Sequence, residues 1–178
     1  MSARKIVILV AILVALGAVA VWLGLGKVKQ PAPPTEAAKP ESLVTVTLYF
    51  GAPDGSRLVP EPRNLKVPGT ELESLRQVAE ALVAGPTGGG IALVPHAAKI
   101  RGVYIDGQTA YIDFSQELID NFAGGSTWEY MLVASIVQTV CGAFPDVQAV
   151  AILVGGQEVD TIGGHLDVSR PLLAKDWR

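Results

Sequence analysis

Residues 6–25 form an uncharged, mostly apolar run, and this run constrains the fold of the chain more than any other feature. As a helix it would be about 30 Å long at about 1.5 Å rise per residue, which matches the hydrocarbon core of a bilayer. A core helix of a soluble protein would carry polar residues on one face. We therefore expect residues 6–25 to be a transmembrane signal anchor that follows a cytoplasmic segment, residues 1–5.

A cleaved signal peptide is the alternative interpretation of this run. Ala18, Val19 and Ala20 have the small-residue pattern of a cleavage site. The apolar run continues through Leu23, however, and is longer than the apolar segment of an ordinary signal peptide. The pattern favours a retained anchor and leaves cleavage open. Residues 26–42 contain four prolines, which is typical of an extended linker between an anchor and a domain.

The remaining residues, 43–178, are expected to form one exported domain. They contain nine Lys/Arg and fifteen Asp/Glu, a net charge of −6. Proteins that bind nucleic-acid phosphates need clustered Lys and Arg, so we expect no nucleic-acid partner. The single cysteine, Cys141, excludes an internal disulfide and a cysteine-based zinc site, and the chain has only two histidines. We therefore expect no metal ion and no cofactor.

Strand signals in the domain come from alternation and from turn residues. Alternating apolar and polar residues predict a strand over residues 43–50, and an extended edge segment with two prolines follows over residues 58–67. Hairpin turns are expected at Asp106-Gly107 and at Gly155-Gly156.

Two helices are also expected. The first begins at Thr70 with a capping box to Glu73 and ends near Gly85. The second begins at Ser126 with a capping box to Glu129, and it is apolar nearly all round, which is typical of a central helix. The order of elements predicts an α+β domain, with two helices packed on one face of a mixed or antiparallel β-sheet, preceded by one transmembrane helix.

Several short motifs resemble, in their order and spacing, the GerMN domain, which is named for sporulation and spore germination proteins. They are Leu93-Val94-Pro95, Ala110-Tyr111-Ile112-Asp113-Phe114-Ser115, the Gly-Gly-Ser sequence at 124–126, and Gly163-Gly164-His165-Leu166-Asp167. The resemblance covers roughly residues 44–174. It implies an α/β fold related to ring-building modules, a place in the bacterial envelope, and an assembly role with no established catalytic centre.

The candidate interaction surface consists of Tyr104, Tyr111, Asp113, His165 and Asp167. The two tyrosines lie on neighbouring strands of a predicted hairpin, where they would pack across the strands or form an aromatic platform. Asp113 and Asp167 are candidates for a glycosidase carboxylate pair, but nothing in the sequence brings them together. His165 and Asp167 could be drawn into a serine triad, but the Gly-x-Ser-x-Gly motif is absent. We therefore expect no enzyme.

Together these features predict a non-enzymatic, single-pass protein of the cell membrane with its C-terminal domain outside the cytoplasm. The domain is expected to mediate protein–protein assembly, and the family resemblance implies sporulation or spore germination as the setting. The expected partners are envelope or membrane proteins, including a second copy of the chain, and the bilayer through residues 6–25. The alternative is a module that binds peptidoglycan or another glycan of the envelope.

Overall fold

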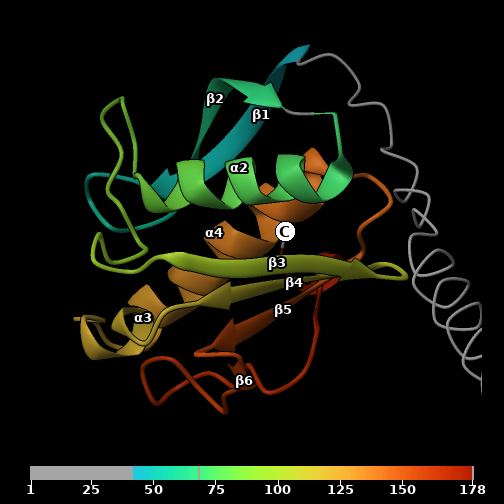
Figure 1. Cartoon of the computed structure of the whole chain (residues 1–178). Coiled ribbons are helices and arrows are strands. Elements are labelled where there is room, and N and C mark those ends of the chain that lie inside the picture. Colours follow the sequence, from blue (N-terminus) through green and yellow to red (C-terminus); the bar gives the residue numbers. More distant parts are fainter. Residues whose placement is uncertain (1–41, 68, 178) are drawn as a thin grey trace, which may run out of the picture. The chain divides into compact units, whose positions relative to one another are not determined.

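The computed structural model describes residues 42–67 and 69–177, and Figure 1 shows the path of the chain. The predicted anchor at 6–25 and nearly all of the predicted linker at 26–42 lie outside the described residues, so both stay predictions. Among the helices that the structure describes, none has the length and apolar character needed to cross a membrane.

The main sheet is mixed, with the strand order β3-β4-β5-β6 and with β7 beside β5. β4 runs antiparallel to β3 and parallel to β5, while β6 and β7 both pair antiparallel with β5. The strands are β3 (Ile100–Asp106), β4 (Thr109–Phe114), β5 (Ala149–Val154), β6 (Gln157–Glu158) and β7 (Leu172–Leu173). The prediction of a mixed sheet is therefore confirmed.

Both predicted hairpins of this sheet are present. The first joins β3 to β4 through Gly107 and Gln108, one residue later than the predicted Asp106-Gly107 turn. The second joins β5 to β6 through Gly155 and Gly156, whose φ angles are 64° and 82°. Two successive residues with positive φ suit the right-handed twist of the flanking strands, and glycine adopts such angles without strain.

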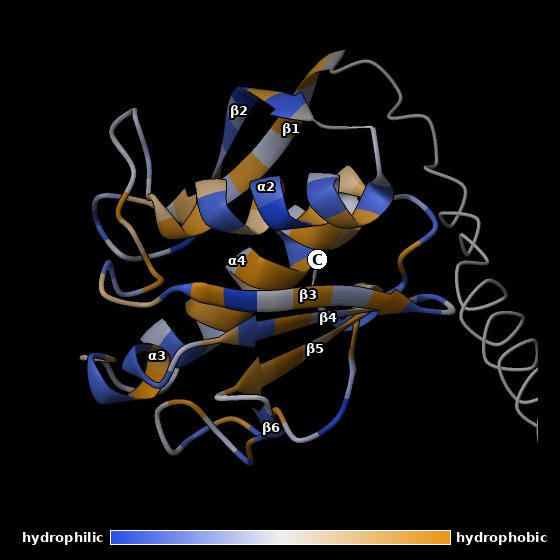
Figure 2. Ribbon diagram, in the orientation of Figure 1, coloured by the Kyte–Doolittle hydropathy of each residue, from blue (hydrophilic) through white to orange (hydrophobic). Residues whose placement is uncertain are grey.

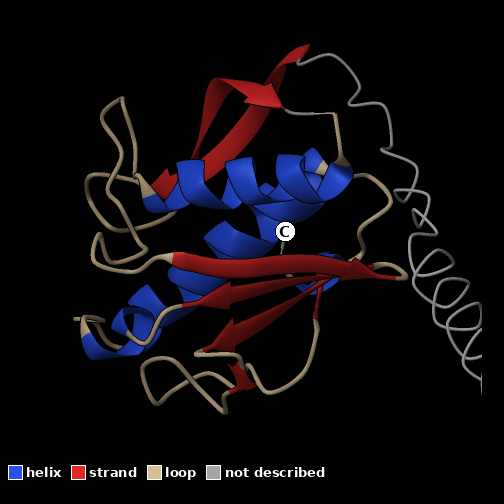
Figure 3. Cartoon of the chain, viewed as in Figure 1, coloured by secondary structure: helices blue, strands red, loops and turns tan. Residues whose placement is uncertain are grey.

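The first two strands form a separate antiparallel ribbon, which differs from the predicted single sheet. β1 (Ser42–Gly51) pairs with β2 (Leu58–Val67), and Figure 3 shows this ribbon on one side of the helices and the main sheet on the other. The free edge of β1 meets helix α4, because the N–H of Tyr49 donates to Thr139 Oγ1 (3.0 Å) and its carbonyl accepts from Ser135 Oγ (2.6 Å). Helix side chains thus occupy the place that another strand would take.

Helix α2 (Glu71–Val83) begins as predicted. Thr70 Oγ1 accepts from the backbone N–H of Glu73 (3.3 Å), and the Thr70 hydroxyl donates to the Glu73 carboxylate (2.7 Å). The buried stripe consists of Leu75, Val78, Ala79 and Leu82. Leu72, in the first turn, is exposed.

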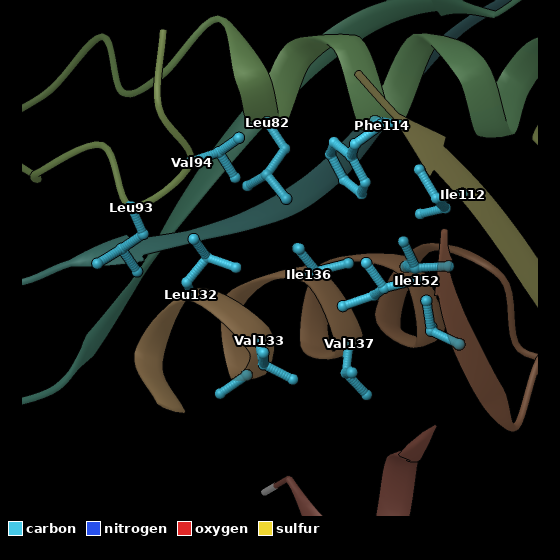
Figure 4. Packing of buried hydrophobic residues seen from close by; sticks show 14 of the residues in the cluster. Leu82, Leu93, Val94, Ile112, Phe114, Leu132, Val133, Ile136, Val137 and Ile152 are labelled. Atoms are coloured by element: carbon cyan, nitrogen blue, oxygen red, sulfur yellow. The ribbon is translucent and has the colours of Figure 1, made fainter. Parts of the chain in front are cut away.

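Helix α4 (Ser126–Ala143) is the central helix, as predicted, and it is preceded by the short α3 (Glu117–Asp120). Figure 2 shows that most of its residues are apolar, and Figure 4 shows its side chains meeting those of the main sheet and of α2. The predicted capping box at its start is wrong, because Gly125 is the N-cap residue and no side chain caps the helix. The Glu129 carboxylate instead reaches a distant loop, as described below.

Candidate interaction surface

The main sheet has two faces, and the described helices cover one of them (Figure 1). Along β4, Ala110, Ile112 and Phe114 are buried in the core, while Tyr111 and Asp113 alternate with them on the opposite face. Residues directly opposite each other on paired strands point to the same side of a sheet. The register therefore defines a second face, which we call the tyrosine face: Gly102, Tyr104, Asp106, Thr109, Tyr111, Asp113, Ala149, Ala151, Leu153, Glu158 and Leu173.

The two candidate tyrosines lie together on this face. Tyr104 and Tyr111 are directly paired, and their rings stack with centroids 4.2 Å apart and an interplanar angle of 7°. The predicted cross-strand packing is therefore confirmed. Tyr104 remains 46% exposed. Partial burial, followed by the charges of Tyr111, Asp106 and Glu158, raises the pKa of Tyr104 above the usual tyrosine value.

Apolar side chains extend this face away from the tyrosine pair. Ala151, which is directly paired with Tyr111, is buried, and Leu153, two residues later on the same side of β5, is half-buried. Leu173 of β7 is 43% exposed. Asp106 and Glu158 add negative charge to this face. An exposed apolar patch with a polar rim is typical of an interaction surface.

Asp113 lies on the same face but is held by structural contacts. Its Oδ1 accepts from the N–H of Gly156 (2.8 Å), and its Oδ2 is 3.4 Å from Nε of Arg101. These contacts tie β4 to the turn between β5 and β6 and to the start of β3. The Asp113 carboxylate therefore stabilises the sheet.

Asp167 is an exposed residue that stabilises its own turn. Its Oδ1 accepts from the backbone N–H (3.0 Å) and the hydroxyl (2.6 Å) of Ser169, and its Oδ2 forms an ion pair with Arg170 (3.3 Å). The hydrogen bonds from Ser169, with a smaller contribution from Arg170, lower the pKa of Asp167. Asp113 and Asp167 are thus each held by partners of their own, Asp113 within the main sheet and Asp167 within its turn.

His165 lies in the same loop as Asp167, and both line a shallow hollow formed by residues between 160 and 169. The imidazole is exposed, whereas the backbone N–H of His165 donates to Glu129 Oε2 (2.9 Å). His165 and Asp167 therefore belong to the loop hollow, whereas Tyr104 and Tyr111 belong to the main sheet. In the described part of the chain, no group of three His, Cys, Asp or Glu side chains is placed to hold a metal ion.

Glu129 is an important residue that the sequence analysis assigned wrongly. Its side chain is buried at the start of α4, and its Oε1 accepts from the Thr161 hydroxyl (2.6 Å) and from the N–H groups of Ile162 (3.0 Å) and Gly163 (2.7 Å). Burial opposes ionisation, but these hydrogen bonds and the one from His165 outweigh it and lower the pKa of Glu129. A single carboxylate within an otherwise apolar helix was the available signal.

A second carboxylate, Glu61 of β2, holds the glycine-rich loop that follows α2. It accepts from the N–H (3.1 Å) and hydroxyl (2.8 Å) of Thr87 and from the N–H of Gly88 (3.0 Å), and it pairs with Arg63. Arg63 in turn donates to the carbonyl of Gly85 (3.2 Å). Burial acts to raise the pKa of Glu61, but these contacts outweigh it and lower the pKa to about 2.

Cys141, the free thiol on α4, is partly buried and lines two neighbouring hollows at the end of the helix. Burial raises its pKa to about 11. The thiolate is the nucleophilic form of cysteine, so a raised pKa disfavours a role as a nucleophile at neutral pH. The side chain packs against the hydrophobic core and keeps some exposure.

The fold and this surface together define a small α+β domain of the GerMN type. The chain belongs to the Germane family, described as sporulation and spore germination, because the family model matches residues 47–160. The resemblance inferred from the sequence motifs is therefore confirmed. A comparison with curated protein sequences finds no significant match.

Solved structures with the same fold include three structures of two bacterial proteins. A putative lipoprotein from Clostridium perfringens is 26% identical, with a TM-score of 0.56, and the match covers 78% of this chain and 93% of that one. The first GerMN domain of the sporulation protein GerM from Bacillus subtilis is 26% identical, with a TM-score of 0.59 and coverage of 75% and 99%. The tandem GerMN domains of the same protein are 23% identical, with a TM-score of 0.58 and coverage of 76% and 48%.

Proposed function

We propose that this chain is a non-enzymatic, membrane-anchored envelope protein whose GerMN domain mediates protein–protein assembly during sporulation or germination. The observation that carries the proposal is the tyrosine face, because a sheet face that the described helices leave uncovered presents the exposed side chains of Tyr104 and Leu173 and the half-buried side chain of Leu153. Family membership supports the setting. The predicted anchor and linker support a position outside the cytoplasm and away from the lipid.

The state of the ionisable groups supports a non-enzymatic role. A general acid at neutral pH needs a raised carboxyl pKa, whereas the pKa values of Glu61, Glu129 and Asp167 are lowered. Asp113 is held by an arginine and a backbone N–H. The pKa of Cys141 is raised to about 11, which keeps the thiol protonated.

Binding to an envelope glycan is the second candidate function, and the exposed ring of Tyr104 favours it. Aromatic rings on a flat surface can stack on sugars. The ring of Tyr104 already stacks on Tyr111, however, so one face of each ring is occupied within the domain. This geometry leaves a smaller free aromatic surface for a sugar and favours a protein partner.

Site-specific photo-crosslinking in the native host tests the proposal. The full-length chain carries p-benzoylphenylalanine in place of Tyr104 or, separately, of Leu173, and cells are irradiated during growth and during starvation. The control position is Leu72 on α2, which is 46% exposed and lies on a helix that covers the opposite face of the main sheet.

We expect crosslinks to one or a few envelope proteins from Tyr104 and Leu173, enriched on starvation, and none of these from Leu72. Crosslinks to wall polymer alone would support the glycan-binding alternative. The same products from all three positions would contradict a specific role of the tyrosine face.

A further inference from the structure

The two outer edges of the β1–β2 ribbon differ in whether they can pair with another strand. On β2, Pro60 lies directly opposite Tyr49 and Pro62 lies directly opposite Thr47. Proline has no N–H, so the outer edge of β2 cannot accept another strand at these two positions. Natural sheets commonly use proline in this way to block an edge.

The outer edge of β1 is blocked over its second half only. The outward N–H and C=O of Tyr49 bond to Thr139 and Ser135 of α4, and those of Gly51 bond to Ile91 (3.0 and 2.7 Å). These contacts show that the odd-numbered residues of β1 turn their backbone groups away from β2, because the outward direction alternates along a strand.

The first half of the same edge is open. By the alternation, Leu43, Thr45 and Thr47 also turn their N–H and C=O groups outward, and the β1–β2 register has no irregularity between them. Within the described part of the chain, these outward groups have no hydrogen-bond partner. Leu43 is 68% exposed and Val44 is 39% exposed, so apolar side chains accompany the open backbone.

We propose that this open edge pairs with the same edge of a second copy of the chain, antiparallel and centred on Thr45. In this register Thr45 faces its counterpart and Leu43 faces Thr47 of the other copy, so all three residues exchange their outward hydrogen bonds. The two ribbons then form one continuous sheet in the order β2-β1-β1-β2. The pairing is self-complementary because it uses the same three residues from each copy.

Charge and tethering identify a second copy as the occupant. The domain has a net charge of −6, yet β1 contains no charged residue, so two β1 strands meet without direct repulsion. The chain N-terminal to the open edge is the predicted linker and anchor, so the edges of two copies would be held at the same distance from one membrane. Such confinement raises the effective concentration of one copy for another.

The proposed pairing rests on the proposed assembly function. It names a second copy of the chain as one partner, which binds at the open edge of β1 and not at the tyrosine face. The β1 edge and the tyrosine face lie on different sheets. Loss of one contact is therefore expected to leave the other in place, and the two proposals fail separately.

Disulfide trapping in host cells tests the pairing. The full-length chain carries Cys141→Ala with either Thr45→Cys or Asn64→Cys, and cells are oxidised briefly with copper phenanthroline before non-reducing electrophoresis. Thr45 and Asn64 are both exposed and directly paired on the two strands of the ribbon. Across the proposed dyad the two Thr45 Cα atoms would be about 5.5 Å apart, within disulfide range, whereas the two Asn64 positions would be about three strand spacings, roughly 14 Å, apart.

We expect at least a tenfold greater yield of disulfide-linked homodimer from Thr45→Cys than from Asn64→Cys. Adding Thr47→Pro, which removes an outward N–H as Pro60 and Pro62 do on β2, is expected to abolish the excess. Equal yields from the two cysteines, or a Thr45→Cys adduct with a different protein, would overturn the inference. If the tyrosine face still captures envelope proteins in either case, the proposed function stands without the homodimer.

Discussion

Glu129 shows how one side chain fixes a distant segment of this domain. A buried carboxylate is costly unless its oxygens accept hydrogen bonds, and here four donors from residues 161–165 surround it. Three of these donors are backbone N–H groups of a loop with little secondary structure of its own. The loop that carries the Gly-Gly-His motif of the family resemblance therefore takes its shape from a residue more than thirty positions earlier.

Replacing Glu129 by glutamine tests this role. Glutamine keeps the size of the side chain but removes the charge and turns an N–H₂ group toward N–H donors, so we expect a loss of about 2–4 kcal/mol in the free energy of unfolding. Urea unfolding of the purified chain measures the change. Asp160→Asn is the matched control, because Asp160 is an exposed carboxylate beside the same loop, and its change is expected to stay within about 0.5 kcal/mol. A loss of similar size in both variants would contradict the argument.

At the scale of elements, Glu61 links strand β2 to the glycine-rich loop after α2. The ionised carboxylate is the form that accepts the hydrogen bonds of Thr87 and Gly88 and pairs with Arg63. Its pKa is lowered in the folded protein, so folding favours the deprotonated form. The loop is thus held by a charge, although its own sequence is mostly glycine.

Stability should therefore depend on pH through Glu61. The pKa falls from 4.5 to about 2 on folding, so the stabilisation is fully present above pH 4.5 and is lost as the pH falls from 4.5 toward about 2. We expect Glu61→Gln to lower the stability at pH 6 and to flatten the decline between pH 4.5 and 3. Urea unfolding at several pH values measures both effects. Glu80→Gln removes an exposed carboxylate paired with Arg76, and a flattening as large as that of Glu61→Gln would refute the assignment.

The elements themselves were largely predictable from local patterns. The two hairpins, the start of α2 and the central position of α4 were all predicted, because alternation, turn glycines and helix capping act over a few residues. The separate β1–β2 ribbon was not predicted, since it depends on Ser135 and Thr139 meeting Tyr49 from far along the sequence. Periodicity contains no information about such a contact.

Only part of the candidate interaction surface was predictable from the sequence. The stacking of Tyr104 on Tyr111 follows from a hairpin register, and the sequence analysis found it. The grouping of Asp113 with the tyrosines is not a shared site, because its carboxylate serves the sheet. His165 and Asp167 lie in a loop whose position is set by Glu129, and no local signal relates that loop to the tyrosine face.

At the scale of the whole molecule, the C-terminal residues close the helix layer. Trp177 is buried, its ring stacks on Tyr130 of α4 with centroids 5.1 Å apart, and its carbonyl accepts from Gln138 Nε2 (2.5 Å). The last residues of the described chain thus stabilise the central helix along which the rest of the core packs.

Trp177→Ala should therefore destabilise the entire domain. Deleting a buried tryptophan side chain costs about 3–5 kcal/mol, so we expect a loss of this size in the free energy of unfolding. Thermal and urea unfolding of the purified chain measure it. Leu173→Ala, at an apolar residue of the same C-terminal segment that is 43% exposed, is the control and should cost less than about 1 kcal/mol. Equal effects would mean that the C-terminal end does not close the core.

The bond between Tyr49 and Thr139 also has a consequence for the order of events during synthesis. The two residues are 90 positions apart, so β1 leaves the ribosome long before the helix that completes its edge exists. During that interval an uncharged strand has only β2 and water as partners, whereas the β3–β4 hairpin closes from neighbouring residues. β1 can thus pair with β2 early, but its outer edge acquires its native neighbours only after α4 has been made, and until then this edge is open to mispairing.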